Sequence, residues 1–302
     1  MYSKIVEIVE VAPRDGLQNE KTLISTADKK ALITRALDTG VRRIEVTSFV
    51  NPKAVPQMAD AESLCEMLPE RPDVTYIGLV MNARGAGRAL ATGRIDQLGA
   101  VVVSTDSFAM ANQGQTSDGS VDAAKEIIAM ARAAGKSAQV TIGAAFGCPF
   151  EGEVPQERVV EMALALAEAD PVEIALADTI GVANPAHVQA LIRKVRAALP
   201  AMPIRVHFHN TRGTGLANVW AAVEEDVATI DCAIGGLGGC PFAPGAAGNV
   251  STEDVVYMLE RAGVRTGLDL SRLVAANQWL GEVMQRQLPG MVAKAPTFPK
   301  QN

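Results

Sequence analysis

The sequence has few aromatic side chains: Phe, Trp and Tyr make up only 4% of its 302 residues, and only two of them are Trp. This scarcity excludes an aromatic core, although hydrophobic residues of all kinds reach 48%. We expect a core of Val, Ile, Leu and Ala, which is typical of parallel strands buried on both faces. The length and composition are consistent with one domain, residues 1–302.

Runs of basic residues are also missing. The chain has 28 Lys and Arg against 34 Asp and Glu, a net charge of −6 at pH 7. This balance argues against nucleic acid as the main partner, and an anionic ligand would need local groups to hold it. No apolar run is long enough to cross a bilayer, so we expect no membrane partner.

The four cysteines do not form a disulfide pattern. Cys65, Cys148, Cys232 and Cys240 are far apart and none belongs to a C-x-x-C pair, so we expect reduced thiols. The strand pattern begins by Ile5, which predicts no leader peptide. These features together predict a cytoplasmic protein.

Eight short runs rich in β-branched residues alternate with helical segments. The strands are expected at 5–12, 42–48, 74–80, 97–104, 137–146, 172–178, 204–209 and 229–235. The helices are expected near 27–39, 57–69, 83–92, 121–135, 156–169, 185–198, 216–226 and 252–263. Eight strands, each followed by a helix, predict an α/β fold, the (β/α)8 or TIM barrel.

An open, doubly wound sheet is the alternative fold. Such a sheet usually carries G-x-G-x-x-G after its first strand, but here Pro13-Arg14-Asp15-Gly16 follows. The tail from Asp269 to about Leu288 predicts one further helix, a C-terminal extension that covers the barrel or a partner subunit.

Polar residues that are unusual in a core stand near the predicted carboxyl ends of the strands, where TIM barrels have their active sites. His207 and His209 are the clearest signal, because residues two apart on a strand face the same side. The alternative is a pair of hydrogen-bonded core histidines. The other polar residues at these ends are Arg14, Asp15, Glu45, Ser48, Asp178, Thr179, Cys240 and Asn249.

Barrel closure makes strands 7, 8 and 1 neighbours, so Asp15, His207, His209 and Asn249 can converge. Two nitrogen and two oxygen ligands suit an octahedral divalent cation, Mg²⁺ or Mn²⁺, better than closed tetrahedral zinc. Zinc amidohydrolases use H-x-H on strand 1 with further histidines, whereas the third histidine here, His187, falls in a predicted helix.

Four other residues have a functional and a structural interpretation each. Arg14 either stabilises enolate charge beside the metal or closes the barrel in an ion pair. Glu45 either orients Arg14 or a metal ligand, or carries a proton, and we favour the first. Asp178 either accepts a proton from a substrate hydroxyl or caps the next helix. Cys240 lies in the segment 235–249, which has six glycines in fifteen residues. Its thiol is either reactive or an incidental part of a tight turn.

Several motifs together resemble one known family, the 3-hydroxy-3-methylglutaryl-CoA lyases of the DRE-TIM metallolyase superfamily. The likeness runs from about residue 4 to residue 268. It is carried by 9–20 (VEVAPRDGLQNE), 44–50 (IEVTSFV), 52–53 (PK), 55–58 (VPQM), 147–152 (GCPFEG), 178–182 (DTIGV) and the glycine-rich segment through 251–254 (STED).

The resemblance implies a lyase that uses a divalent metal to cleave a carbon–carbon bond of a 3-hydroxy-3-methylglutaryl-CoA-like thioester, as in leucine degradation in the cytoplasm. It also implies a homo-oligomer, a dimer or tetramer. The implied metal ligands are Asp15, His207, His209 and Asn249. The implied catalytic residues are Arg14 and Cys240, supported by Glu45 and Asp178. We further expect substrate contacts from Arg14, Gln18, Ser48, Thr179 and Arg212.

The sequence departs from the family at two loops. It reads His207-Phe208-His209-Asn210-Thr211-Arg212-Gly213, where the family usually has H-C-H-D-T-Y-G. The segment 104–114 also lacks the family's usual pattern after strand 4. The reaction type is therefore better indicated than the acyl group. One alternative is a synthase, which forms the carbon–carbon bond that a lyase cleaves. The other is a barrel that binds metal or acyl-CoA without catalysis.

Overall fold

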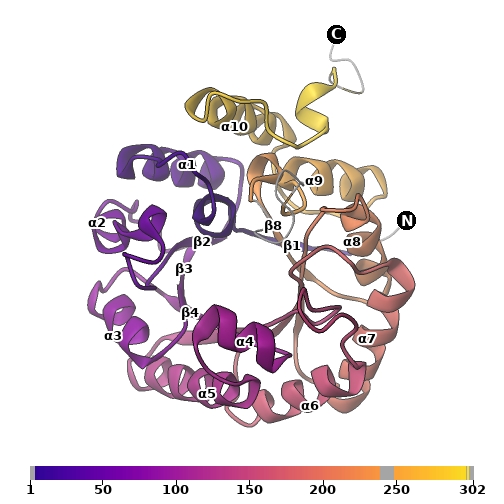
Figure 1. Cartoon of the computed structure of the whole chain (residues 1–302). Coiled ribbons are helices and arrows are strands. Elements are labelled where there is room, and N and C mark those ends of the chain that lie inside the picture. Colours follow the sequence, from indigo (N-terminus) through magenta and orange to yellow (C-terminus); the bar gives the residue numbers. More distant parts are fainter. Residues whose placement is uncertain (1–3, 239–247, 297, 299–302) are drawn as a thin grey trace.

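A closed parallel barrel forms the centre of the molecule (Figure 1). The computed structural model describes residues 4–238, 248–296 and 298. Each strand pairs with the next and β1 pairs with β8, which confirms the predicted TIM barrel. The strands are β1 Glu7–Glu10, β2 Arg43–Ser48, β3 Thr75–Val80, β4 Gln97–Val103, β5 Ser137–Gly143, β6 Ile174–Asp178, β7 Ile204–Phe208 and β8 Thr229–Cys232.

Helices surround the barrel (Figure 1). They are α1 Thr26–Asp38, α2 Ala61–Glu66, α3 Ala83–Ala91, α4 Asp106–Gln113, α5 Ser117–Ala133, α6 Gln156–Ala167, α7 Pro185–Ala198, α8 Gly215–Glu224, α9 Thr252–Arg261 and α10 Leu270–Val283. Short turns of helix are η1 Ala12–Gly16, η2 Pro56–Met58, η3 Ile234–Gly236 and η4 Val292–Lys294.

Side-chain caps fix where several helices begin. The side chains of Ser25, Thr116, Asn184, Ser251 and Asp269 each accept a hydrogen bond from the backbone N–H three residues further on. Each such bond satisfies a donor that has no partner within the helix. These capping residues therefore determine where the preceding loops end and the helices begin.

The clearest differences from the expected elements are a shortened strand, a divided helix and an additional helix. The strand expected at 5–12 is shorter, because the chain turns into the π-helix η1 soon after β1. The helix expected at 57–69 is divided into η2 and α2. Helix α4 lies where no helix was expected.

The predicted aliphatic core is confirmed between strands and helices. Ile142, Leu176 and Val206 are completely buried there, among many other Val, Ile, Leu and Ala residues. The prediction is wrong for the barrel interior, where charged side chains replace aliphatic ones. Arg205 is 1% exposed and contacts Asp231 and Glu173, and Glu173 also pairs with Arg43.

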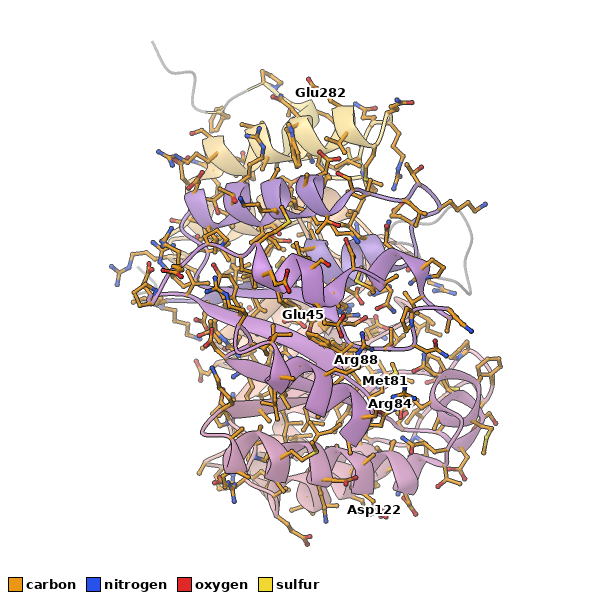
Figure 2. The ribbon with its side chains drawn as sticks, turned by 90° about the vertical axis from the view of Figure 1, so that its left-hand side faces the viewer. Glu45, Met81, Arg84, Arg88, Asp122 and Glu282 are labelled. Atoms are coloured by element: carbon orange, nitrogen blue, oxygen red, sulfur yellow. The ribbon has the colours of Figure 1, made fainter. Side chains whose placement is uncertain are left out.

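The predicted C-terminal extension is also confirmed. Helix α10 packs against α1 and α9 outside the ring of helices (Figure 1). In the side view of Figure 2, Glu282 on α10 and Asp122 on α5 mark opposite edges of the molecule, with Glu45 between them. Among the helices that the structure describes, none is long and apolar enough to cross a membrane.

Candidate active site

The turn after β1 brings Arg14 and Asp15 over the barrel mouth. Buried Glu10 at the end of β1 accepts hydrogen bonds from Ala12 N and Ile234 N, which ties this turn to the segment after β8. Residues Ala12–Gly16 then form one π-helical turn. Such turns often occur at functional sites, because they displace side chains from the regular path of the chain.

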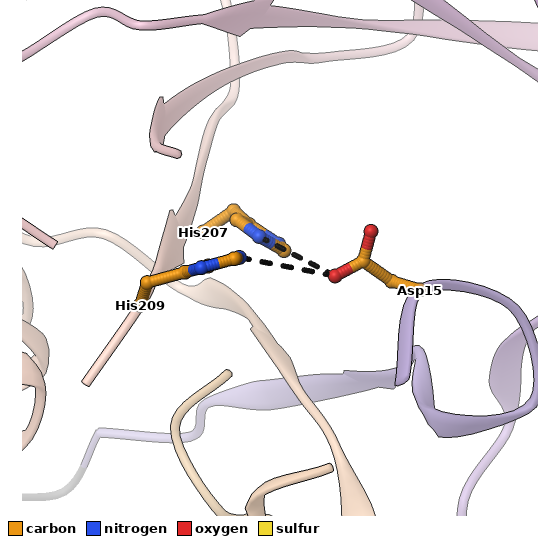
Figure 3. A group of neighbouring side chains, drawn as sticks. All are labelled: Asp15, His207 and His209. Carbon is orange, nitrogen blue, oxygen red and sulfur yellow. Dashed lines mark ion pairs between the residues drawn. The ribbon is translucent and has the colours of Figure 1, made fainter. Parts of the chain in front are cut away.

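The two histidines of β7 face Asp15 (Figure 3). Nε2 of His207 and Nε2 of His209 each lie 3.9 Å from Oδ2 of Asp15, and the two ring centroids are 5.2 Å apart. One ligand atom from each of the three residues lies within 4.8 Å of the others. The predicted convergence of these side chains is therefore present, although His209 lies one residue beyond the end of β7.

Asn249 joins the group from the other side. An isolated bridge pairs it with His209, and its Nδ2 donates to Asp15 Oδ2 at 2.7 Å and to Leu237 O at 3.0 Å. Because a carbonyl oxygen only accepts, the amino group of Asn249 must face Leu237. Its Oδ1 is buried and has no partner among the described residues.

Glycine at position 238 makes this arrangement possible. Its φ of +114° is rarely adopted by other residues, and an added Cβ would lie 2.7 Å from Nδ2 of Asn249. A side chain here would displace the amide.

The charges of the site favour an ionised aspartate and a neutral His209. Burial opposes ionisation of Asp15, but Arg14 and the two histidines outweigh it and hold the pKa of Asp15 well below its ordinary value. Burial and the charge of His207 lower the pKa of His209 to about 4. Both are the forms that bind a cation.

His207 has a partner on its other ring nitrogen. Its Nδ1 lies 3.2 Å from Oδ2 of Asp231. Burial opposes protonation of His207, but this hydrogen bond and the charge of Asp15 raise its pKa.

Arg14 is fixed by two carboxylates. Its Nε donates to Oε1 of Glu45, and its Nη1 donates to Oδ1 of Asp15 at 2.6 Å. Glu45 thus orients Arg14, which is the interpretation of Glu45 that we favoured, and burial raises the pKa of Glu45 although Arg14 opposes the shift. Arg14 therefore forms ion pairs, as its structural interpretation predicted, and it also lines the cavity, as its functional interpretation requires.

A cavity of about 350 Å³ opens above these groups. Arg14, Asp15, Glu45, His207 and His209 line it on the polar side. The remaining lining residues come from several strands, from the segments that follow them and from α4: Gln18, Asn19, Leu79, Met81, Val101, Val103, Phe108, Asn112, Thr141, Gly143, Ala177, Thr179 and Asp231. The cavity thus combines charged and polar groups with apolar side chains, as ligand sites commonly do.

The expected substrate contacts differ in their positions. Gln18 and Thr179 line the cavity. Ser48 is buried and does not line the cavity, but its Oγ lies 3.4 Å from Oε1 of Gln18, which does. Arg212 is exposed and donates to the carbonyl oxygens of Ile180 and Gly181.

Asp178 holds the loop after β6. Its two carboxylate oxygens accept hydrogen bonds from Val182 N at 2.9 Å and Ala183 N at 3.0 Å, just before α7. Burial raises its pKa. The capping interpretation is wrong, because the N-cap of α7 is Asn184 and Asp178 binds backbone N–H groups of the preceding loop. Proton transfer by Asp178 stays a prediction. Cys240 lies outside the described residues.

Sequence reasoning missed Asp231. It is the one acid in the strand TIDC, just as Glu45 is the one acid in β2, and this signal could have found it. Phe108 and Asn112 lie in the segment 104–114 that departs from the family pattern, but the helix on which they stand, α4, was not expected.

The closed barrel and the polar cluster at the carboxyl ends of β7 and β1 define a TIM-barrel enzyme. Comparison with known proteins identifies its family. A family model described as HMGL-like matches residues 5–280. The chain therefore belongs to the HMGL-like family, and it is a carbon–carbon lyase of the hydroxymethylglutaryl-CoA lyase type.

Two similar curated proteins have different substrates in their names. The (R)-citramalyl-CoA lyase of Chloroflexus aurantiacus is 43% identical, over 98% of this chain and 96% of its own length. A hydroxymethylglutaryl-CoA lyase of Bacillus subtilis is 41% identical, over 95% of this chain and 96% of its own length.

Solved structures of similar proteins share the fold. The HMG-CoA lyase of B. subtilis superposes with a TM-score of 0.94 at 40% identity, covering 97% of this chain and 98% of that chain. An HMG-CoA lyase from Acinetobacter baumannii, in complex with coenzyme A and 3-methylmalate, gives 0.94 at 37% identity, covering 100% of this chain and 98% of that chain.

Proposed function

We propose that this protein cleaves a 3-hydroxy-3-methylglutaryl-CoA-like thioester with the help of a divalent cation, Mg²⁺ or Mn²⁺. The products from the parent substrate would be acetyl-CoA and acetoacetate. The observation that supports this most is the convergence of Asp15, His207 and His209, together with Asn249, whose Nδ2 donates to Asp15 and whose Oδ1 is buried. Family membership and the coenzyme A bound to the A. baumannii neighbour support the acyl-CoA part.

The residues present fit a divalent cation. Oδ1 of Asn249 is a buried acceptor without a partner among the described residues, and burial of such an atom is costly unless a ligand satisfies it. Asp15, Asn249 and the two histidines would hold the cation, with oxygen and nitrogen donors suited to Mg²⁺ or Mn²⁺. Once bound, the cation would act as a Lewis acid that makes the 3-hydroxyl of the substrate more acidic.

The chain's own residues would do the remaining work. The 3-hydroxyl would lose its proton to solvent, its carbon would become the new ketone, and the bond between C2 and C3 would break, with its electron pair passing to the acetyl-CoA enolate. Arg14, fixed by Glu45 and Asp15, would place its guanidinium beside the enolate oxygen. We propose that Cys240 gives a proton to the enolate carbon, which yields acetyl-CoA.

Citramalyl-CoA is the second candidate substrate, because the relative with 43% identity is named a citramalyl-CoA lyase. This thioester carries its carboxylate directly on the carbinol carbon and would give acetyl-CoA and pyruvate. Arg212 and helix α4 around Asn112 are where a different acyl group would be recognised, since the sequence departs from the usual family pattern there.

A substrate panel tests the proposal. Purified protein with Mn²⁺ is incubated with 3-hydroxy-3-methylglutaryl-CoA, a longer 3-alkyl analogue and both enantiomers of citramalyl-CoA. The products are identified by mass spectrometry. We expect acetyl-CoA from each thioester that is cleaved. The second product would be acetoacetate from 3-hydroxy-3-methylglutaryl-CoA, a longer keto acid from the 3-alkyl analogue, or pyruvate from citramalyl-CoA. If no thioester is cleaved, but acetyl-CoA with a 2-oxo acid releases free CoA, the protein is a synthase instead.

Replacing Arg14 with lysine should lower kcat by about 100-fold, the order expected for losing one preorganised donor to an oxyanion. Lysine keeps the charge but loses the planar group that contacts Glu45 and Asp15 at the same time. Mn²⁺ affinity, measured by calorimetry, should stay close to that of the unmodified protein.

Arg88 offers a matched control for this variant. It also pairs with a carboxylate, Glu62, through Nε and Nη2, but it does not line the cavity. Arg88→Lys should keep kcat within about twofold, as expected for a surface change away from the site. A kcat for Arg14→Lys equal to that of Arg88→Lys would make Arg14 a structural residue.

A further inference from the structure

Asp231 contacts His207 across two neighbouring strands. Strand β8 pairs with β7 so that Asp231 and His207 are register partners, and both side chains face the barrel interior. Oδ2 of Asp231 lies 3.2 Å from Nδ1 of His207. The opposite nitrogen of His207, Nε2, faces Asp15 at 3.9 Å.

Arg205 fixes the carboxylate from its other side. Nη1 of Arg205 donates to Oδ1 of Asp231 at 2.7 Å. The same guanidinium donates to Thr141 Oγ1 at 3.0 Å, and its Nε lies 3.3 Å from Oε1 of Glu173. Since Arg205, Asp231 and Glu173 are all nearly completely buried, this network leaves the Asp231 carboxylate little freedom to rotate.

His209 is held differently. Its Nδ1 is buried and has no partner among the described residues. The two histidines therefore have unequal surroundings, although both Nε2 atoms face the same aspartate oxygen. Among the described residues, a carboxylate contacts Nδ1 of His207 but not Nδ1 of His209.

We infer that Asp231 is a positioning residue for His207. By accepting a hydrogen from Nδ1, it fixes the ring orientation and the tautomer in which the lone pair of Nε2 faces the candidate metal site. This inference rests on the proposed metal-dependent function. Neither Asp231 nor Arg205 belongs to the ligand set expected from the sequence.

Asp231→Asn is the variant that tests the inference. The carboxylate accepts from two donors, Arg205 and His207, whereas an amide has one acceptor oxygen and so can satisfy only one of them. We expect Mn²⁺ affinity, measured by calorimetry, to fall by about 10- to 100-fold, the usual effect of losing a partner of a metal-bound histidine. At saturating Mn²⁺, kcat should recover most of its unmodified value.

Glu173→Gln is the matched control. It removes another buried carboxylate next to Arg205 but does not touch His207. Its Mn²⁺ affinity should stay within about threefold of the unmodified protein, because no contact of a ligand is lost. Equal weakening in both variants, or unchanged affinity in Asp231→Asn, would overturn the inference.

Folding must be checked separately, because Asp231→Asn leaves Arg205 with less compensation of its buried charge. If that variant does not fold, Asp231→Ala combined with Arg205→Gln removes the pair of charges together with the acceptor for Nδ1 of His207, and should show the same loss of Mn²⁺ affinity. If the unmodified protein binds no Mn²⁺, it is the proposed function that fails. Binding by the unmodified protein with no loss in the folded variants contradicts the inference alone.

Discussion

Replacing His209 with alanine is expected to abolish lyase activity and to weaken Mn²⁺ binding strongly. The side chain is 7% exposed, it is held neutral near pH 7 by its lowered pKa, and its Nε2 faces Asp15. Its loss leaves Asp15, His207 and Asn249 with one nitrogen donor instead of two. We expect a fall in affinity of at least about 100-fold, more than for a residue that acts only through a ligand.

The measurement is a calorimetric titration with Mn²⁺, made beside an assay for acetyl-CoA. The remaining histidine is the control: His187 lies on α7, packs edge-on against Phe146, and does not line the cavity. His187→Ala should bind Mn²⁺ like the unmodified protein. Unchanged Mn²⁺ affinity in His209→Ala would remove this residue from the metal site.

Replacing Cys240 with alanine should reduce bond cleavage by about 100- to 10,000-fold, the usual range for losing a positioned acid or base. The proposal comes from the resemblance of its glycine-rich segment to the family's pattern. Because the residue is proposed only as a proton donor, folding, Mn²⁺ affinity and substrate binding should remain close to normal. Single-turnover rates with saturating substrate separate these effects.

Alkylation gives an independent test of the same thiol. Cys65, Cys148 and Cys232 are buried, and burial raises the pKa of Cys65 to about 12, so iodoacetamide should react with them slowly. Inactivation should therefore follow modification of Cys240, mapped by mass spectrometry, and bound substrate should protect it. A Cys240→Ala variant that cleaves at the unmodified rate would assign the proton to another donor.

The parts of the site that could be predicted are those that follow from periodicity and closure. His207 and His209 share a face because the side-chain period of a strand is two, and barrel closure brings β1 beside β8. Arg14 and Asp15 then had to lie near the histidines. These statements need only the order of the strands, and the structure confirms them.

Other parts depend on packing between distant segments, which no local pattern shows. The π-helical turn of Ala12–Gly16 is fixed by Glu10, whose carboxylate binds a backbone N–H from beyond β8. The orientation of the Asn249 amide depends on the carbonyl of Leu237. Helix α4 forms where no helix was expected, and it adds Phe108 and Asn112 to the cavity.

The charged barrel interior is a further case. Low aromatic content predicted aliphatic packing, and the outer layer of the strands follows that rule. Arg43 and Arg205 are tolerated inside because carboxylates lie at hydrogen-bonding distance: Glu173, just before β6, reaches Arg43 of β2 across the barrel, and Asp231 of β8 pairs with Arg205 of β7. Pairing of this kind depends on register, and strand register cannot be derived from the composition of one strand.

The central claim is that this chain breaks a carbon–carbon bond of an acyl-CoA with a metal held by Asp15, His207, His209 and Asn249. The most direct measurement uses protein freed of metal by a chelator and then titrated with Mn²⁺, while acetyl-CoA release from 3-hydroxy-3-methylglutaryl-CoA and citramalyl-CoA is followed. We predict no release without metal, full activity at one Mn²⁺ per chain, and no recovery in His209→Ala. Equal cleavage by the metal-free protein, or recovery in that variant, would contradict the account.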